Sequence, residues 1–320
     1  MVLKTPVVST KSDSPDLASI KQSVESRLSV LLPQPDLRDS VAAAMRDCAL
    51  APGKRLRPLL LILTASDLGH SAPAVLDIAC AVEMVHAASL VLDDMPCMDN
   101  AALRRGLPTT HVAYGEDIAI LAAVALLSQA FRTVASAPGV TGAVRADLVL
   151  ALSEAVGTQG LVRGQFEDLR EGAQSRTPDQ IAATNTLKTS MLFRVAVDMA
   201  AIMAQANHAV RLSLRRFADE LGQAYQLLDD IKDYGDAAVE GKDIGKDVGK
   251  STLIGVLGIG AGRLRLADHV AQAHLCIDDA CGGGNAIHRL LNTMFPAELP
   301  EHVAPSMDYV TGENRRLAAA

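Results

Sequence analysis

Five charged residues that lie close together in the sequence are well suited to phosphate chemistry. An apolar, helix-like run ends at Asp93 and Asp94, Asp99 follows after a short interval, and the cationic pair Arg104 and Arg105 comes next. Carboxylates bind divalent cations, and guanidinium groups bind phosphate oxygens. Their combination indicates a phosphate group that is held through metal ions.

Asp93 and Asp99 could not share an ion on an unbroken helix. An α-helix turns by about 100° per residue, so the two carboxylates would point about 120° apart. Pro96 lies between them and cannot supply the helical hydrogen bond. We therefore expect residues 95–98 to form a bulge or loop that folds Asp99 back toward Asp93. A solvated helix end with acidic residues is the simpler alternative.

A second acidic motif, DDIKD, contains Asp229, Asp230 and Asp233. Asp229 and Asp233 are four residues apart and share one face of a helix, where two like charges are unfavourable unless a cation or a basic ligand lies between them. Mg²⁺ takes carboxylate oxygens and shares the rest of its shell with substrate phosphates, whereas zinc would call for a Cys/His cluster that this sequence lacks. The second motif therefore strengthens the case for magnesium.

These motifs belong to a longer series that resembles the trans-isoprenyl diphosphate synthases, and within them the bacterial geranylgeranyl diphosphate synthases of carotenoid pathways. The order and approximate spacing match over nearly the whole chain. The motifs are GKRLRP at 53–58, EMVHAASLVLDDMPCMD at 83–99, LRRGLPTTH at 103–111, GQFEDL at 164–169, LKTS at 187–190, GQAYQLLDDIKD at 222–233 and GKDIGKDVGKST at 241–252. The resemblance implies an all-α fold, in which residues 1–320 form a single polyprenyl synthase domain: one large helical bundle around a central cavity.

The resemblance also implies a role for individual residues. Asp93, Asp94, Asp99, Asp229 and Asp233 would bind magnesium, with three Mg²⁺ ions present when substrate is bound. Isopentenyl diphosphate would be bound by Lys54, Arg57, His86 and Arg105, and the allylic diphosphate by Arg104, Lys188, Thr189, Gln226 and Lys242. Without the resemblance, simpler interpretations apply. A basic loop such as the one with Lys54 and Arg57 is usually only solvated, and a lone histidine on an apolar helix, such as His86, is usually a core residue. The role of Arg55 is left open.

The implied reaction is a head-to-tail prenyl transfer. The metal ions, held chiefly by Asp93, Asp99 and Asp229, would offset the charge on the departing diphosphate together with Arg104, Lys188 and Lys242. The C–O bond ionises, isopentenyl diphosphate attacks the allylic carbocation, and the departed diphosphate takes the final proton. Thr189 and Gln226 would place oxygen dipoles near the cation.

Two other readings belong to different functional classes. A class I terpene cyclase also ionises an allylic diphosphate, but it usually carries an Asn/Ser/Glu motif in place of the second aspartate motif and needs no isopentenyl site. A catalytically silent regulatory subunit of a synthase usually loses one aspartate motif. This chain keeps both motifs.

Product length is predicted from the helix that precedes Asp93. One isoprene unit is about 5 Å long and one helical turn about 5.4 Å, so the helix can act as a ruler for a tail that is anchored at the aspartates. Ala88 stands where related farnesyl diphosphate synthases commonly carry an aromatic side chain. Its methyl group would let the tail pass toward Met84 and predicts geranylgeranyl diphosphate. Farnesyl or longer products are the alternatives, and close helix packing is the simplest explanation of Ala88.

Composition agrees with a cytoplasmic enzyme. The formal net charge of −7 argues against a nucleic-acid partner. The five cysteines are odd in number and form no CxxC pair, so we expect reduced thiols. Residues 1–13 lack the apolar core of a signal peptide and predict a flexible tail.

The remaining pattern is helical, with no strong β signal. The apolar run Ile118–Leu127 is too short to span a bilayer, so no transmembrane segment is predicted; it suits a buried or dimer-interface helix, and we expect a homodimer. Residues 234–251, rich in Gly, Asp and Lys, predict a lid loop in which Lys242 and Lys250 match the family and Lys246 does not. The helices are expected near 14–31, 37–50, 57–68, 73–95, 115–135, 141–170, 178–204, 208–233, 263–281 and 284–294.

Overall fold

The computed structural model describes residues 16–36, 38–172, 174–235, 252–283 and 286–296. These residues are mostly helical with almost no strand, so the predicted all-α fold is confirmed. Two short strands, β1 (Leu103–Arg104) and β2 (Leu107–Pro108), pair antiparallel. The helices are α1 Leu17–Leu31, α2 Ser40–Leu50, α3 Leu56–Asp67, α4 Ala74–Asp93, α5 Thr110–Tyr114, α6 Glu116–Ala135, α7 Gly142–Val156, α8 Leu161–Glu171, α9 Pro178–Asn185, α10 Met191–Met203, α11 His208–Gly235, α12 Leu253–Leu257, α13 Ile259–Cys281 and α14 Ala286–Met294, with a π-helical turn at Thr186–Ser190.

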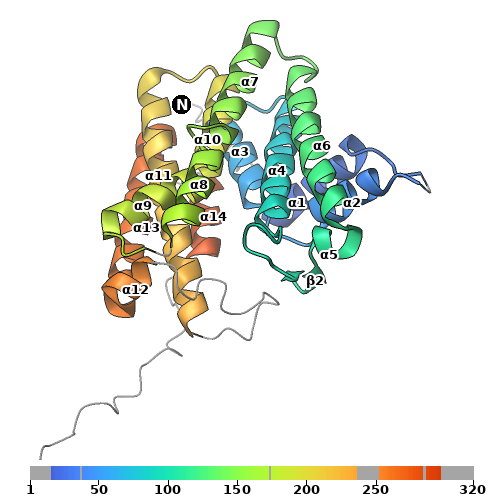
Figure 1. The fold of residues 1–320 in the computed structure, drawn as a ribbon. Coiled ribbons are helices and arrows are strands. Elements are labelled where there is room, and N and C mark those ends of the chain that lie inside the picture. The colour runs from blue at the N-terminus through green and yellow to red at the C-terminus, as the bar shows by residue number, and fades with distance from the viewer. Residues whose placement is uncertain (1–15, 37, 173, 236–251, 284–285, 297–320) are drawn as a thin grey trace, which may run out of the picture.

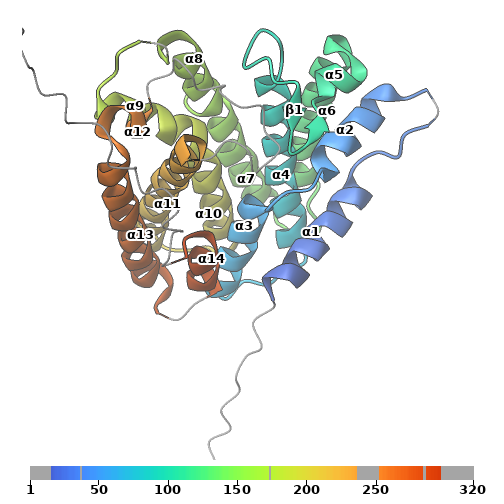
Figure 2. The ribbon, with the colours of Figure 1, turned by 90° about the horizontal axis from the view of Figure 1, so that it is seen from below.

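The helices form one bundle in which α3 and α10 occupy the middle. Figure 1 shows α4 and α6 on one side of them and α11 and α13 on the other. Helix α10 packs on α3, α4 and α11, so it joins the two sides. Seen along the bundle, α1 and α2 flank α4 (Figure 2), and α14 closes against α3.

Helix α4 is buried over most of its length because its sequence is apolar on nearly every face. Residues such as Ile78, Val82 and Ala88 are fully buried, as expected for a helix that lacks a polar stripe. It packs most extensively on α6. The apolar core thus holds rigid the helix whose end carries the first aspartate motif.

The predicted single helix over residues 141–170 is wrong, because the chain forms two helices with a break at 157–160. A Cβ atom on Gly160 would lie 2.6 Å from the carbonyl carbon of Ala155 and 2.8 Å from the carbonyl oxygen of Glu154. Only a glycine lets the backbone turn back so closely. The break separates α7 from α8, and α8 carries the GQFEDL motif.

Several helix boundaries differ from the predicted ones. Helix α2 begins three residues later than predicted, after Asp39, whose carboxylate accepts a hydrogen bond from the Ala42 amide. Helix α13 begins at Ile259 because the chain breaks at Gly258, where φ is +79°. Helix α11 extends to Gly235, so it includes the first two residues of the predicted 234–251 loop.

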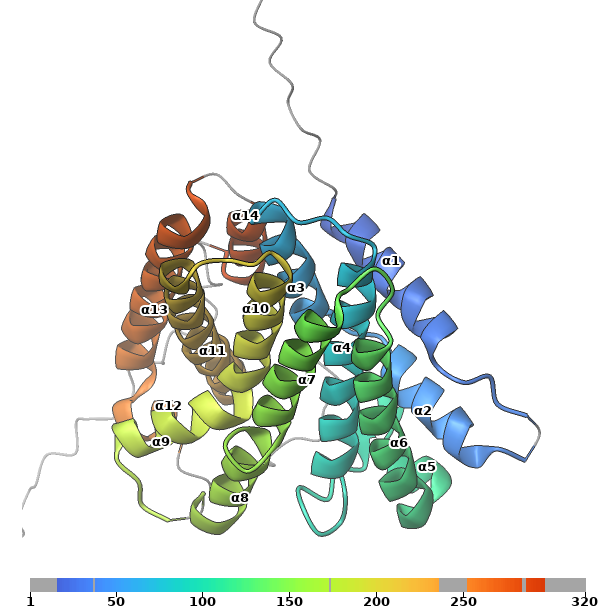
Figure 3. The ribbon, with the colours of Figure 1, turned by 90° about the horizontal axis from the view of Figure 1, so that it is seen from above.

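By length and composition alone, α4 and α6 could each cross a membrane, a test that the core helix of a soluble protein also passes. The predicted ten-residue run lies within the 20-residue α6, whose most apolar 18-residue stretch has a mean hydropathy of 1.8, and α4 has the same length and the same value. The most apolar window of α4 is 72% buried, but that of α6 is only 39% buried. Figure 3 shows α6 beside α7, and α6 leaves part of its apolar surface uncovered.

Candidate active site

The chain bends back immediately after α4. The amide of Asp99 donates to the carbonyl of Asp93 at 2.9 Å, and the amide of Asn100 donates to the carbonyl of Met95 at 3.0 Å. Helix α4 ends at Asp93, and Pro96 lies in the turn that follows. The predicted loop is confirmed, and it returns Asp99 to Asp93.

Asp93 lies among both acidic and basic groups. Burial raises the pKa of its carboxyl to about 6, and the negative charges of Asp99 and Asp94 act in the same direction, against the cations of Lys188 and Arg104. A carboxylate that is costly to ionise in the metal-free protein would gain from a divalent cation. This environment fits the predicted magnesium ligand.

Asp94 is bound by Arg104 in this structure. Arg104 Nε lies 2.9 and 2.8 Å from the two carboxylate oxygens, and Nη2 donates to Oδ1 at 2.6 Å. The Asp94 residue is only 3% exposed. Burial lowers the pKa of Arg104, but the hydrogen bonds and charge of Asp94 outweigh burial, and the pKa is raised. This contact gives Asp94 the role of holding Arg104, while its predicted role as a metal ligand stays a prediction.

Arg57 and His86 form a half-buried pair between α3 and α4. Arg57 Nη1 lies 3.2 Å from His86 Nε2. An arginine can only donate, so Nε2 accepts and the imidazole proton is on Nδ1. Burial and the cations of Arg57 and Arg105 hold the pKa of His86 well below its usual value, so the ring is neutral. Arg57 also stacks over Phe193, 5.0 Å from the ring centroid, and no sequence motif signals this contact.

Lys54 lies on the rim of an apolar cavity of about 500 Å³. Leu56, Tyr225, Leu228 and Lys232 are among the other residues of its lining, so the cavity extends from the loop before α3 to the last turns of α11. Lys54 itself is exposed. A lysine at the mouth of an apolar cavity suits a ligand with an anionic head and a hydrocarbon body.

The LKTS motif forms a π-helical turn, Thr186–Ser190, between α9 and α10. Lys188 Nζ donates to Asp168 of α8 at 2.7 Å, and Thr189 Oγ1 donates to Gln226 of α11 at 3.0 Å. Gln226 in turn donates to Asp230 at 2.8 Å. The turn therefore connects α8 to the second aspartate motif.

Glycines on two neighbouring helices allow this π-turn. A Cβ atom on Gly164 would lie 2.6 Å from the amide nitrogen of Lys188, and one on Gly222 would lie 2.5 Å from Ser190 Cβ. The widened turn fills the space that a side chain would occupy in an ordinary helix contact. The predicted helix over 178–204 is therefore interrupted at its functional residues.

Electrostatic interactions and hydrogen bonds connect several of the predicted residues. Asp93 interacts electrostatically with Lys188 of the π-turn, and Asp229 of α11 interacts in the same way with Arg57 of α3. Arg57 bonds to His86 on α4, the helix that ends at Asp93. Each aspartate motif therefore lies within electrostatic range of a cationic side chain. Asp229 is half-buried, whereas Asp233 is exposed.

No group of three or more His, Cys, Asp or Glu side chains in the described residues could hold a metal ion alone. Mg²⁺ commonly binds through one or two carboxylates and completes its shell with water and substrate phosphates. The donor set of Asp93 and Asp99 fits that mode. Lys242, the 236–251 part of the predicted lid and the 1–13 tail lie outside the described residues.

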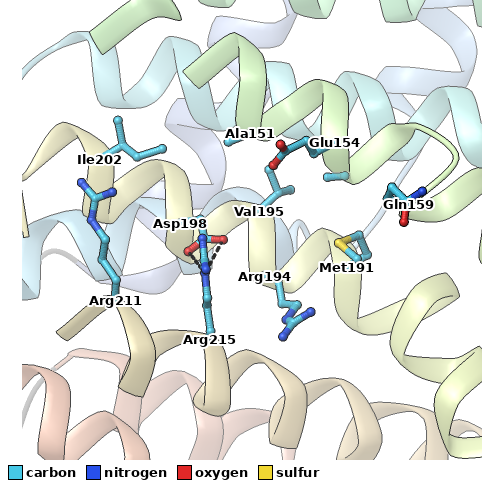
Figure 4. A pocket seen from close by; sticks show the side chains of 11 residues that line it. Ala151, Glu154, Gln159, Met191, Arg194, Val195, Asp198, Ile202, Arg211 and Arg215 are labelled. Carbon is cyan, nitrogen blue, oxygen red and sulfur yellow. Dashed lines mark hydrogen bonds and ion pairs between the residues drawn. The ribbon is translucent and has the colours of Figure 1, made fainter. Parts of the chain in front are cut away.

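A second cavity, of about 380 Å³, lies between α7, α10 and α11 and contains none of the predicted site residues (Figure 4). Two of the arginines that line it form ion pairs. Arg215 Nε donates to both carboxylate oxygens of Asp198, at 2.8 and 3.0 Å, and Arg194 pairs with Asp219 at 2.8 Å. We therefore assign no part of the predicted site to this cavity.

The sequence matches the polyprenyl synthetase family over residues 38–273. The chain belongs to this family. It is 52% identical to the geranylgeranyl diphosphate synthase of Pantoea ananas, over 86% of this chain and 91% of that protein. It is 49% identical to the enzyme of the same name from Pseudescherichia vulneris, over 89% of this chain and 93% of that protein. A geranyltransferase from Helicobacter pylori, solved with magnesium and isoprenyl diphosphate, superposes with a TM-score of 0.78 at 27% identity, covering 88% of this chain and 98% of that one.

Proposed function

We propose that this protein is a geranylgeranyl diphosphate synthase, a trans-prenyltransferase that condenses isopentenyl diphosphate head-to-tail with allylic diphosphates. The observation that carries the proposal is that both aspartate motifs lie within electrostatic range of cationic side chains, Asp93 of Lys188 and Arg104, and Asp229 of Arg57. Carboxylates beside cationic side chains suit a metal-bound diphosphate. Two relatives of that name, at 49% and 52% identity, support the product assignment.

Isopentenyl diphosphate is bound, in this proposal, by Lys54, Arg57, His86 and Arg105. The buried Nε of Arg57 and Nδ1 of His86 have no hydrogen-bond partner in the described structure. Both atoms carry hydrogens, so both can donate to a diphosphate oxygen. Because His86 is neutral, the positive charge of this subsite comes from Lys54 and the two arginines.

The allylic diphosphate occupies the side nearer the π-turn. Asp93, Asp99 and Asp229 would hold Mg²⁺, with Asp94 and Asp233 as outer candidates; when bound, the metal neutralises the leaving diphosphate. Lys188 and Arg104 add positive charge there, and Lys242 would do so from the 234–251 lid. Thr189 and Gln226 are fixed by their mutual hydrogen bond, so their oxygens present fixed dipoles to the allylic cation. We also propose that three Mg²⁺ ions are present when substrate is bound.

Ala88 and Met84 are proposed to set the product length. Both are fully buried on α4, on the N-terminal side of Asp93. A tail anchored at Asp93 and running back along α4 passes the methyl group of Ala88 before it reaches Met84. Met84 lies about one turn beyond Ala88, and one turn spans about one isoprene unit, so the tail is one unit longer than the fifteen carbons at which an aromatic side chain at position 88 would stop it.

We further propose a cytoplasmic homodimer that forms through α6. The outer face of this helix exposes Ile120, Leu121 and Val124 at 48%, 53% and 59%. Leu150 on the adjacent α7 is 56% exposed. Neighbouring large apolar side chains on a surface are characteristic of a protein interface.

Product analysis of the purified protein tests the function. The protein is incubated with Mg²⁺, isopentenyl diphosphate and, separately, the five-, ten- and fifteen-carbon allylic starters, and the products are sized. A twenty-carbon product supports the proposal. Products that stop at fifteen carbons or extend beyond twenty would reassign it to a farnesyl or longer-chain synthase. If the protein forms no product by itself but increases the activity of an added synthase, it is a regulatory subunit.

A further inference from the structure

A buried ion pair joins the loop before α3 to the middle of α4. Arg55 and Glu83 are 4% and 3% exposed, and Arg55 Nη1 donates to Glu83 Oε1 at 2.8 Å. Arg55 Nη2 also donates to the carbonyl of Ala51 at 2.7 Å, and the Glu25 carboxylate lies 3.5 Å from Arg55 Nε. The guanidinium is thus engaged by protein groups inside the fold.

The backbone of Arg55 is in an unusual conformation. Its φ and ψ are 52° and 36°, the left-handed region that residues other than glycine mostly avoid. This conformation turns Arg55 inward while Lys54 is exposed and Arg57 points to His86. The ion pair holds the side chain inward, so it also holds the loop in the conformation that orients its two neighbours.

A second arginine holds the same loop from the other side. Arg105 Nη1 donates to the carbonyl of Pro52 at 2.7 Å. A Cβ atom on Gly53 would lie 2.5 Å from the same Nη1, so glycine is needed for this approach. Two successive carbonyl groups, of Ala51 and Pro52, are therefore held by guanidinium groups from different parts of the chain.

We propose that Arg55 and Glu83 are positioning residues for the binding of isopentenyl diphosphate. They do not touch the substrate; they place Lys54 and Arg57, which do. Glu83 lies three residues before His86, so the helical segment that anchors the loop also carries the third group of this subsite. The inference rests on the proposed function, because it names the substrate that the loop binds.

The positioning role can be separated from simple stabilisation. Replacing a buried ion pair by apolar side chains of similar size is often neutral for stability, whereas removing one partner is destabilising. The test variant is therefore the double substitution Arg55→Met/Glu83→Leu. The matched control is Arg27→Met/Asp77→Leu, because Arg27 donates to Asp77 of the same helix at 2.5 and 2.9 Å, away from the loop.

Steady-state kinetics with both substrates and thermal unfolding are measured for the three proteins. We expect the double variant to raise the KM for isopentenyl diphosphate at least tenfold and to change the KM for the allylic substrate less than threefold. The control pair should leave both KM values within threefold of wild type. Isothermal titration with isopentenyl diphosphate alone should show the same selective loss of affinity.

An unchanged KM for isopentenyl diphosphate in the folded double variant, or an equal rise for both substrates, would overturn the proposal. If that variant does not fold, Glu83→Asp replaces it, because this change keeps both charges but withdraws the carboxylate from Arg55. Glu83→Asp should also raise the KM for isopentenyl diphosphate more than the KM for the allylic substrate. A KM for isopentenyl diphosphate equal to that of wild type would overturn the proposal. If the wild-type protein forms no prenyl product, the proposed function fails, while titration still reports whether the loop pair controls diphosphate binding.

Discussion

The carboxyl group of Asp93 lies close to a second carboxylate and is also costly to ionise in the metal-free protein. It is held beside Asp99 by the bend after α4, and burial raises its pKa to about 6. The same proximity makes a pair of oxygen ligands available to a hard cation. The geometry that favours metal binding therefore lowers the stability of the protein without metal.

The first prediction is that Asp93→Asn stabilises the metal-free protein at pH 8. The folded pKa of about 6 lies above the usual 3.8, so the penalty for ionisation is absent below pH 3.8, grows up to pH 6 and is complete above it. Because the residue is partly exposed, we expect the free energy of unfolding to rise by about 1 kcal/mol, which corresponds to about 2–4 °C in Tm. Calorimetry between pH 5 and 8 measures it. A gain that does not shrink as the pH falls would contradict this account.

The second prediction concerns activity. Asp229→Ala should lower kcat/KM at least about 100-fold while the fold persists, because the loss of electrostatic stabilisation of the leaving diphosphate costs several kcal/mol. Asp198→Ala is the control, since Asp198 pairs with Arg215 at the cavity outside the site. It should keep activity within about threefold. Activity in Asp229→Ala above about one hundredth of wild type would rule out the proposed metal role.

At the scale of single elements, the π-turn at Thr186–Ser190 places Lys188 and Thr189. It exists because Gly164 and Gly222 leave room for its extra width. The turn sends the Lys188 ammonium to Asp168 and the Thr189 hydroxyl to Gln226. An ordinary helix would rotate both side chains to other directions.

The third prediction is that Gly222→Ala reduces activity at least about tenfold. The added Cβ would lie 2.5 Å from Ser190 Cβ and 2.7 Å from Ser190 Cα, so rotating the serine side chain cannot relieve the overlap. Overpacking of this kind costs about 1–3 kcal/mol. Gly260→Ala in α13 is the control, because it meets open space and should leave activity unchanged. Wild-type kinetics in Gly222→Ala would show that the π-turn is not required.

The fourth prediction concerns α4 as a ruler. Ala88→Tyr fills the space through which the tail is proposed to pass, so the main product should shift from twenty to fifteen carbons. Met84→Ala should shift it the other way, because it removes the proposed floor. Chromatographic sizing of the products measures both changes. An unchanged product profile in a folded, active Ala88→Tyr protein would refute the ruler at this position.

At the scale of the whole molecule, the uncovered face of α6 is the feature that a monomer does not explain. The most apolar 18-residue stretch has a mean hydropathy of 1.8 in both α4 and α6, but that of α6 is only 39% buried. Covering Ile120, Leu121 and Val124 with the same face of a second copy would remove this surface from water.

The fifth prediction is that Val124→Lys produces a folded monomer. Opposed lysines near a two-fold axis would bury like charges in an apolar interface, which is unfavourable. Leu264→Lys is the control, because Leu264 of α13 is 71% exposed and lies outside α6. It should leave a dimer, as measured by sedimentation. A dimeric Val124→Lys protein, or a monomeric wild type, would refute the α6 interface.

The sequence by itself determined the features that follow from local rules. The helical periodicity predicts the all-α fold, and the Pro96 bend between Asp93 and Asp99 follows from the missing amide hydrogen of proline. These features involve residues near each other in the chain, so they need no knowledge of distant partners.

Only the tertiary structure decided how the charged groups are paired. In the sequence Asp94 is indistinguishable from its neighbour Asp93, yet the 103–108 hairpin brings Arg104 onto Asp94 and leaves Asp93 beside Lys188. Likewise, Arg55 is buried because Glu83 approaches it from another helix. The free energy of a charge depends on the partners and the water around it, and both are set by chain segments far apart in sequence.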